Sequence, residues 1–125
     1  SEVYTGGLGS YSVTLMVLSF LQLHPKLQRG EMSADKNLGT LLMEFLELYG
    51  KNYGYDECAI SVRGRGKYLS KRQKGMYDYR KPFMLSIEDP HDPSTCLLFL
   101  HNLHFFSLSM TLPLTHVRYF FFSYF

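Results

Sequence analysis

The sequence predicts a single, mainly helical domain with a small β element. Two apolar stretches, residues 11–24 and 37–51, carry hydrophobic side chains at helical spacing. Residues 59–69 contain two short apolar runs around a turn that holds glycine. Hydrophobic residues make up 46% of the 125 residues, which is enough for one core. The length therefore fits one small domain or part of a larger one.

The first helix is expected over residues 11–24. A glycine-rich turn at residues 6–9 precedes it, and Ser10 is the expected N-cap. The helix is apolar on nearly every side, which is typical of a core helix. Pro25 ends it, and the polar residues 28–36 predict a loop.

The second helix is expected over residues 37–51. Leucine and aromatic side chains recur there at i, i+3, i+4 and i+7, so one face is buried. Gly50 and Gly54 supply its stop signal.

The β element is expected as a short hairpin, followed by an extended run. Residues 59–62 and 67–69 flank Arg63-Gly64-Arg65-Gly66, a sequence that favours a turn. Residues 82–87 are then extended and apolar. They lead into an acidic loop over residues 88–93, where two prolines prevent helix formation.

Charge divides the chain into two parts. All eleven Asp and Glu, and twelve of the thirteen Lys and Arg, lie in residues 1–94, whereas Arg118 is the only formal charge in residues 95–125. We expect residues 1–94 to be a partial domain and the apolar tail to be non-native or poorly ordered. One alternative is that the tail forms a buried C-terminal hairpin or helix. A membrane anchor is the less favoured alternative, because residues 97–114 are long enough to span a bilayer but contain two histidines, an asparagine and a proline.

Three patterns suggest binding sites. The glycine turn and Ser10 at a helix start could receive a phosphate group, with Tyr11 stacking on a base, although an ordinary capped helix has the same pattern. The acidic residues Glu88, Asp89 and Asp92 could accept hydrogen bonds from a nucleotide or bind a metal, or could simply form a turn. The third pattern is a run of basic residues over residues 63–81.

Residues 63–81 hold eight basic residues and one acid, Asp78, with three tyrosines between them. Basic residues interleaved with aromatics suit a track for single-stranded nucleic acid. Arg63, Arg65 and Lys67 are the candidate RNA-binding residues. A solvated basic face is the alternative interpretation.

Four motifs, in order along the chain, resemble one protein family. They are EVYTGGLGSYS at residues 2–12, SFLQLHP at 19–25, NLG at 37–39 with FLELYG at 45–50, and SIEDP at 86–90. They are similar to the central domain of the DNA-polymerase-β-like poly(A) polymerases, and most of all to the TRAMP-type members, the topoisomerase-related function proteins. From about residue 38 onward the chain resembles the PAP-associated domain.

The resemblance implies a nuclear enzyme that uses ATP, with Mg²⁺ or Mn²⁺, to add adenylates to RNA 3′ ends in RNA surveillance and processing. It implies a zinc-knuckle RNA-binding subunit, a helicase and the exosome as partners. We expect no association with a membrane. It also implies that Ser10 touches the triphosphate and Tyr11 stacks on the incoming base. Asp89 and Asp92 fall in the loop that reads the base.

The chain also departs from the family pattern. The family carries an upstream palm domain, with a Gly-Ser motif and three metal-binding carboxylates, and none of it appears in these 125 residues. After Pro93 the family continues with an Asn-Asp pair, but here the chain reads Thr95-Cys96-Leu97-Leu98. We therefore expect a fragment with the ATP-binding and RNA-contacting part and no catalytic or metal-binding residue. The alternatives are an RNA-binding module without catalysis and a small tail-anchored protein.

Overall fold

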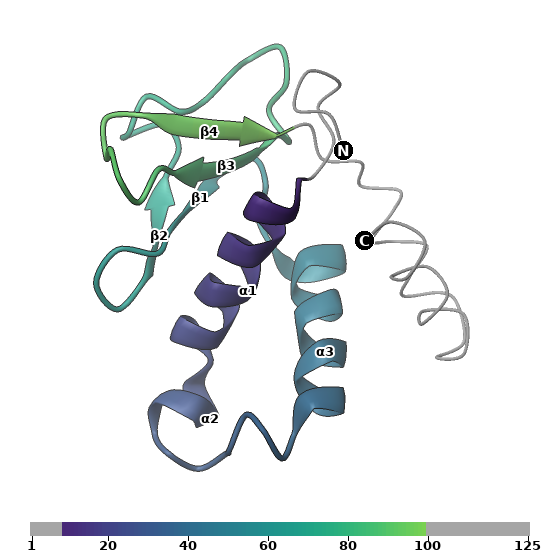
Figure 1. Ribbon diagram of the computed structural model, residues 1–125. Helices are drawn as coiled ribbons and strands as arrows, with labels where there is room; N and C mark the ends of the chain where they lie inside the picture. Colours follow the sequence, from purple (N-terminus) through teal and green to yellow (C-terminus); the bar gives the residue numbers. More distant parts are fainter. Residues whose placement is uncertain (1–8, 100–125) are drawn as a thin grey trace.

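The computed structural model describes residues 9–99, which form three α-helices and a four-stranded sheet. The elements are α1 (Ser10–Leu23), α2 (Pro25–Gln28), α3 (Leu38–Glu47), a π-helical turn (Leu48–Asn52), β1 (Cys58–Ser61), β2 (Lys67–Ser70), β3 (Leu85–Glu88) and β4 (Cys96–Phe99). The helices lie on one side of the sheet (Figure 1). The expected combination of helices and a small β element is correct, but the sheet has two strands more than the predicted hairpin.

The start of α1 differs from the prediction by one residue. Ser10 is the first helical residue and not the N-cap; Gly9 is the N-cap, in an extended conformation, and supplies no side-chain cap. The carbonyl of Gly9 accepts hydrogen bonds from the Val13 N–H and from the Ser12 hydroxyl, at 3.2 and 2.7 Å. The helix ends at Leu23, because the residue before Pro25 is extended.

The predicted loop after α1 begins instead with the short helix α2. Pro25 is its first residue, a position where a missing N–H costs nothing and the fixed φ suits the helix. The His24 Nδ1 accepts a hydrogen bond from the Leu27 N–H at 3.4 Å, and its Nε2 pairs with the carboxylate of Glu44 in α3. The corner between α1 and α2 is therefore tied to α3.

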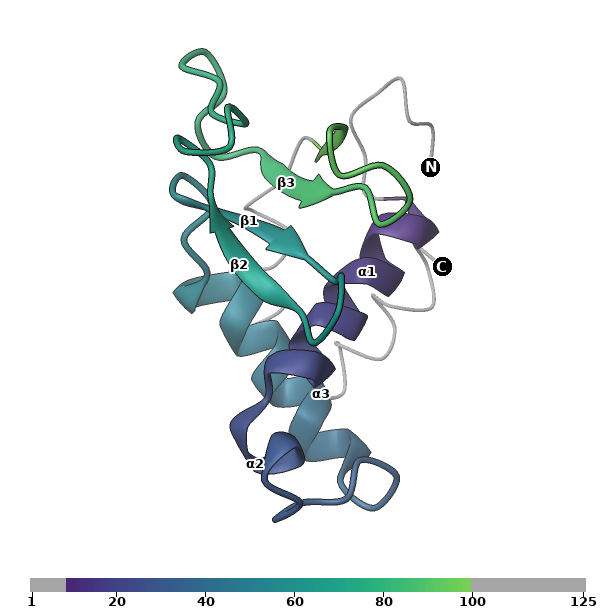
Figure 2. The same ribbon diagram turned by 90° about the vertical axis from the view of Figure 1, so that its left-hand side faces the viewer.

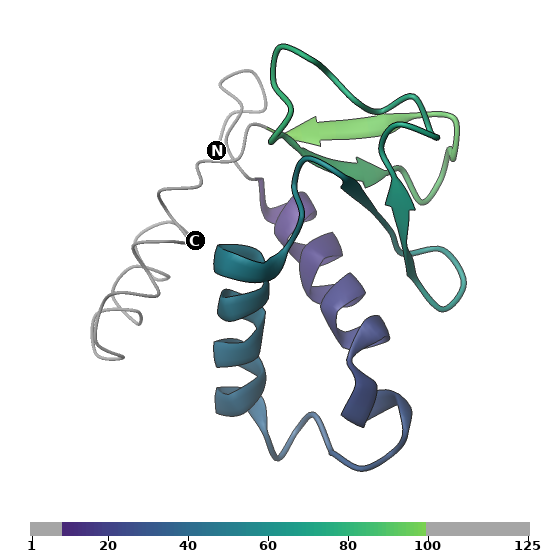
Figure 3. The same ribbon diagram turned by 180° about the vertical axis from the view of Figure 1, so that it is seen from behind.

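The helices α1 and α3 lie side by side under the sheet (Figure 3). The rings of Phe20 and Phe45 meet edge to face between them, with centroids 5.7 Å apart. The helix expected over residues 37–51 is α3 continued by the π-helical turn, which places Tyr49 in the core with no exposed surface.

The strand order in the sheet is β2-β1-β3-β4. The pair β1–β2 is the predicted antiparallel hairpin, with Ile60 opposite Tyr68. The extended run becomes β3, which pairs parallel to β1 with Ile60 opposite Ile87, and antiparallel to β4.

The strand β4 lies on the tail side of the boundary expected after Ser94, and that boundary stays a prediction. Residues 100–125, which hold most of the possible membrane anchor, lie outside the described residues. Among residues 9–99, no helix is long and apolar enough to cross a membrane.

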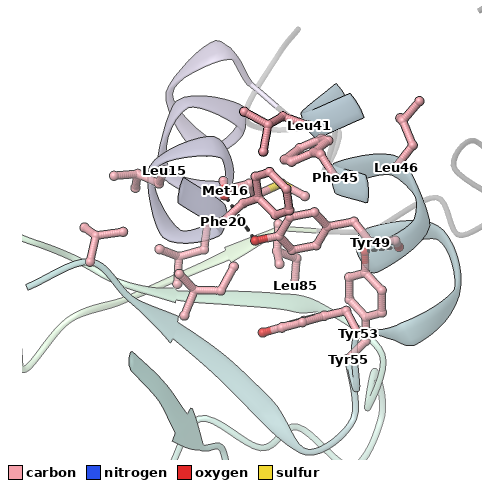
Figure 4. Close-up of a cluster of buried hydrophobic side chains, with 13 residues drawn as sticks. Leu15, Met16, Phe20, Leu41, Phe45, Leu46, Tyr49, Tyr53, Tyr55 and Leu85 are labelled. Atoms are coloured by element: carbon pink, nitrogen blue, oxygen red, sulfur yellow. Dashed lines mark hydrogen bonds between the residues drawn. The ribbon is translucent and has the colours of Figure 1, made fainter. Parts of the chain in front are cut away.

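Three buried tyrosines, Tyr49, Tyr53 and Tyr55, pack in the core between the helices and the sheet (Figure 4). The Tyr49 hydroxyl donates to the carbonyl of Met16 in α1 at 3.1 Å, and the Tyr55 hydroxyl donates to the Tyr49 carbonyl at 2.6 Å. The Tyr53 hydroxyl donates to the Cys58 carbonyl at 3.0 Å. Each buried phenol therefore has a backbone partner, which avoids the cost of an unpaired polar group.

The segment between β2 and β3, residues 71–84, runs over the face of the sheet away from the helices (Figures 1 and 3). Lys71 fixes both ends of this segment. Its side chain is 1% exposed, and its Nζ donates to the carbonyls of Pro82 and Met84, at 3.1 and 2.5 Å.

Candidate nucleic-acid interface

The turn between β1 and β2 presents the three basic residues selected from the sequence. Arg63, Arg65 and Lys67 are all exposed. Gly64 and Gly66 have φ values of 64° and 76°, which side-chain-bearing residues rarely adopt. We call residues 63–67 the basic turn.

The basic turn is held against α1, as Figure 2 shows. The Gln22 Nε2 donates to the carbonyl of Val62 at 3.0 Å and to that of Gly64 at 3.4 Å. A Cβ added at Gly66 would lie 2.5 Å from the Gln22 Oε1, so the Gln22 amide group would have to move if any other residue replaced this glycine. Sequence reasoning missed Gln22, although a lone amide in an apolar helix is the signal that could have found it.

The basic stretch over residues 63–81 is not uniformly exposed. Lys71 is buried, and burial lowers the pKa of its ammonium group. Its role is to hold the segment after β2, so it is unavailable to a nucleic acid. The other basic residues of this segment remain exposed, and they are Arg72, Lys74, Arg80 and Lys81.

The first two residues of α1 are exposed. Ser10 is exposed and Tyr11 keeps 49% of its surface accessible. Gly9 has no side chain to accept from the N–H groups of Ser10, Tyr11 and Ser12, and no acceptor for these three groups is found among residues 9–99. These donors and the positive end of the helix dipole favour an anion.

The loop after β3 holds Asp89 and Asp92. The Asp89 carboxylate accepts a hydrogen bond from the His91 N–H at 2.9 Å. The Asp92 carboxylate accepts from the Ser94 hydroxyl and N–H and from the Thr95 hydroxyl, and these bonds hold the pKa of that carboxyl below its usual range. Asp92 is therefore ionised at neutral pH, and both of its carboxylate oxygens accept hydrogen bonds within its own loop.

Glu88 does not belong to that acidic loop, which corrects the sequence prediction. It is the last residue of β3 and 4% exposed. Its Oε1 accepts a hydrogen bond from the Ser61 hydroxyl at 2.9 Å, on the neighbouring strand. The parallel pairing of β1 with β3, which the sequence did not predict, creates this contact.

No cluster of metal-ligating side chains is found among residues 9–99. Magnesium requires several oxygen ligands in close octahedral geometry. Across residues 9–99, no three His, Cys, Asp or Glu side chains are grouped closely enough to hold an ion. We therefore assign no role in metal-ion catalysis to these residues.

The predicted nucleotide residues fall in two separate places. The start of α1, with Ser10 and Tyr11, lies near the end of β4, whereas the loop with Asp89 and Asp92 lies at the opposite end of β3 (Figures 1 and 3). The basic turn forms a third place, beside the C-terminal half of α1. The residues within each of these three places lie close together, but the structure does not bring the three places to one site.

Comparisons with known proteins agree on one family. Residues 37–95 match the model of the Cid1 family poly A polymerases. Over 92 residues, 74% of the chain, the sequence is 59% identical to poly(A) RNA polymerase CID14 of Cryptococcus neoformans and 50% identical to poly(A) RNA polymerase cid14 of Schizosaccharomyces pombe. The match spans only 12% and 14% of these relatives' lengths.

The fold is similar to a solved structure of the polymerase core of TRAMP, an RNA surveillance complex. The TM-score is 0.73 at 36% sequence identity, and the match covers 87% of this chain and 36% of the other. The chain therefore matches the PAP-associated domain of the Cid1-family, TRAMP-type poly(A) RNA polymerases, of which it spans only a small part.

Proposed function

We propose that this domain supplies RNA and ATP contacts to a nuclear polymerase that adds adenylates to RNA 3′ ends in RNA surveillance and processing. The observation that carries the proposal is the exposed basic turn, fixed on a domain of this polymerase family. The described helices and sheet would then be part of the helical central domain. A zinc-knuckle RNA-binding subunit, a helicase and the exosome are the partners that the family match suggests.

The RNA contact rests on the charges of the basic turn. Arg63, Arg65 and Lys67 are exposed within five residues, and Gln22 limits the motion of the backbone that carries them. Cations fixed close together bind successive phosphates of one strand and release condensed counterions. The turn binds the RNA backbone without reading sequence, as a polymerase that acts on many RNAs requires.

The ATP contact rests on the start of α1. The open N–H groups and the Ser10 hydroxyl suit a triphosphate, and the exposed Tyr11 ring suits stacking on adenine. Asp89 and Asp92 are proposed as the base-reading loop on the family resemblance alone.

The divalent metal ions of the reaction would stabilise charge on the transferring phosphoryl group. Residues 9–99 hold no group of three metal-ligating side chains, and we propose that another part of the polymerase holds these ions. What this domain contributes is binding and orientation of the two substrates.

Replacing the three cations of the basic turn is expected to weaken RNA binding and flatten its salt dependence. For single strands, log K falls by about 0.7 per phosphate contact for each tenfold rise in salt, so the variant Arg63→Gln, Arg65→Gln, Lys67→Gln should lose about 2 from the slope. Fluorescence anisotropy with a labelled RNA oligonucleotide, across a salt series, measures this.

The matched control removes the same charge elsewhere. Lys26, Lys36 and Lys51 are exposed and lie outside the basic turn, so replacing all three with Gln should leave the slope near that of the unmodified chain. Equal losses in the two triple variants would show that net charge, and not the basic turn, determines binding.

A further inference from the structure

A pocket opens where β2 ends, beyond the basic turn along the same strand. Its volume is about 350 Å³. Tyr68 contributes a ring that is 42% exposed. The other lining residues are Glu57, Cys58, Leu69, Ser70 and Arg72. An aromatic face, a carboxylate acceptor and a guanidinium around a small cavity are suited to one nucleobase and its phosphate.

Arg72 also belongs to a row of three side chains in contact next to the pocket. Its guanidinium carbon lies 4.2 Å from the centroid of the Tyr77 ring, in a cation–π contact. The Tyr77 ring meets the Tyr79 ring edge to face, with centroids 4.8 Å apart. Tyr79 remains 81% exposed, so a large aromatic surface faces solvent at the end of this row.

The row is carried by a backbone that is held at both ends. The Lys71 Nζ binds the carbonyls of Pro82 and Met84, and the Lys71 carbonyl accepts from the Met76 N–H at 2.8 Å. Between them, the Asp78 carboxylate accepts from the Arg80 N–H at 2.8 Å. An aromatic surface fixed in this way loses little conformational entropy on binding.

The segment that carries the row is also rich in positive charge. Lys74, Arg80 and Lys81 are exposed in the same segment, while the side chain of Asp78, its one acid, is engaged by the backbone. Positive charge that follows a nucleic-acid backbone, together with rings that stack on bases, is the combination found in single-strand binding sites.

We propose that the pocket and the Arg72–Tyr77–Tyr79 row form a stacking subsite for single-stranded RNA, separate from the basic turn. One base enters the pocket against Tyr68, Arg72 binds the adjoining phosphate, and a neighbouring base stacks on Tyr79. The edge strand β2 connects this subsite to the basic turn; Lys67–Ser70 spans about 10 Å, so one strand can follow both. The inference rests on the proposed RNA-binding function.

The test measures binding of the full 125-residue chain to a fluorescein-labelled oligoadenylate of about 12 nucleotides by anisotropy. Tyr79→Ala should weaken binding about tenfold without changing the salt slope, since it removes stacking and no charge. Tyr79→Phe should bind as the unmodified chain does. Arg72→Gln should lower the slope by about 0.7.

Phe83 provides the control, because it is 53% exposed in the same segment but is not a member of the row. Phe83→Ala should leave affinity unchanged. Normal binding by Tyr79→Ala, together with weak binding by the basic-turn variant, would overturn the subsite and leave the proposed function intact. Equal losses from Phe83→Ala and Tyr79→Ala would also overturn it, and an unmodified chain that binds no oligoadenylate would overturn both proposals.

Discussion

Raising the pH above 10 is expected to unfold this domain cooperatively. Burial is the main cause that raises the pKa values of Tyr49, Tyr53 and Tyr55 well above their ordinary value of 10.0. Their stabilising contribution is complete below pH 10 and is lost as the pH rises further, because the unfolded chain releases these protons first. Three such groups together cost about 4 kcal/mol for each unit above pH 10.

Other buried groups modify this pH dependence. Burial raises the pKa values of the Cys58 and Cys96 thiols, which adds a loss of stability that begins near pH 9. Burial lowers the pKa of the Lys71 ammonium group, so this group has the opposite effect. The free energy of unfolding increases through it as the pH rises toward 10.5. The three tyrosines outweigh this single group.

Urea unfolding at a series of pH values, with tyrosinate absorbance recorded in parallel, measures the effect. We expect the buried phenols to ionise only in the same transition that removes helical structure. If all ten tyrosines of the chain titrated near pH 10 while the helices persisted, the buried cluster would be contradicted.

Truncating Tyr49 is expected to be the most damaging single substitution in the core. Its side chain has no exposed surface, its ring contacts those of Phe45 and Tyr53, and its hydroxyl donates to the Met16 carbonyl. Tyr49→Ala should lower the free energy of unfolding by about 3–5 kcal/mol, because a large cavity opens and a buried carbonyl loses its donor.

The conservative variant separates these two effects. Tyr49→Phe keeps the ring and removes only the hydrogen bond, so it should cost about 1 kcal/mol in the same denaturant experiment. A loss below about 1 kcal/mol for Tyr49→Ala would place this ring outside the core.

The elements that the sequence predicted are those determined by local patterns. The helical spacing located α1 and α3 to within a few residues, and the glycine-containing turn located the β1–β2 hairpin. The N-cap was misplaced, because serine is usually the better cap and nothing local shows that Gly9 takes that position. The pairing of β1 with β3 joins residues far apart in the chain, which no local pattern reports.

The candidate site was predictable to a similar extent. Exposure of Arg63, Arg65 and Lys67 follows from a basic turn between strands. The burial of Lys71 and Glu88 does not, because each depends on a distant backbone carbonyl or hydroxyl that only the fold brings near. Charge in a sequence therefore indicated where a nucleic acid could bind, but not which charges support the structure.

The most direct test of the account incubates the purified 125-residue chain with ATP, Mg²⁺ and an end-labelled RNA. We predict that the RNA is bound through the basic turn yet keeps its length, because residues 9–99 contain no group of three metal-ligating side chains for the catalytic ions. Longer RNA products that require this chain, or RNA that is never bound, would contradict it.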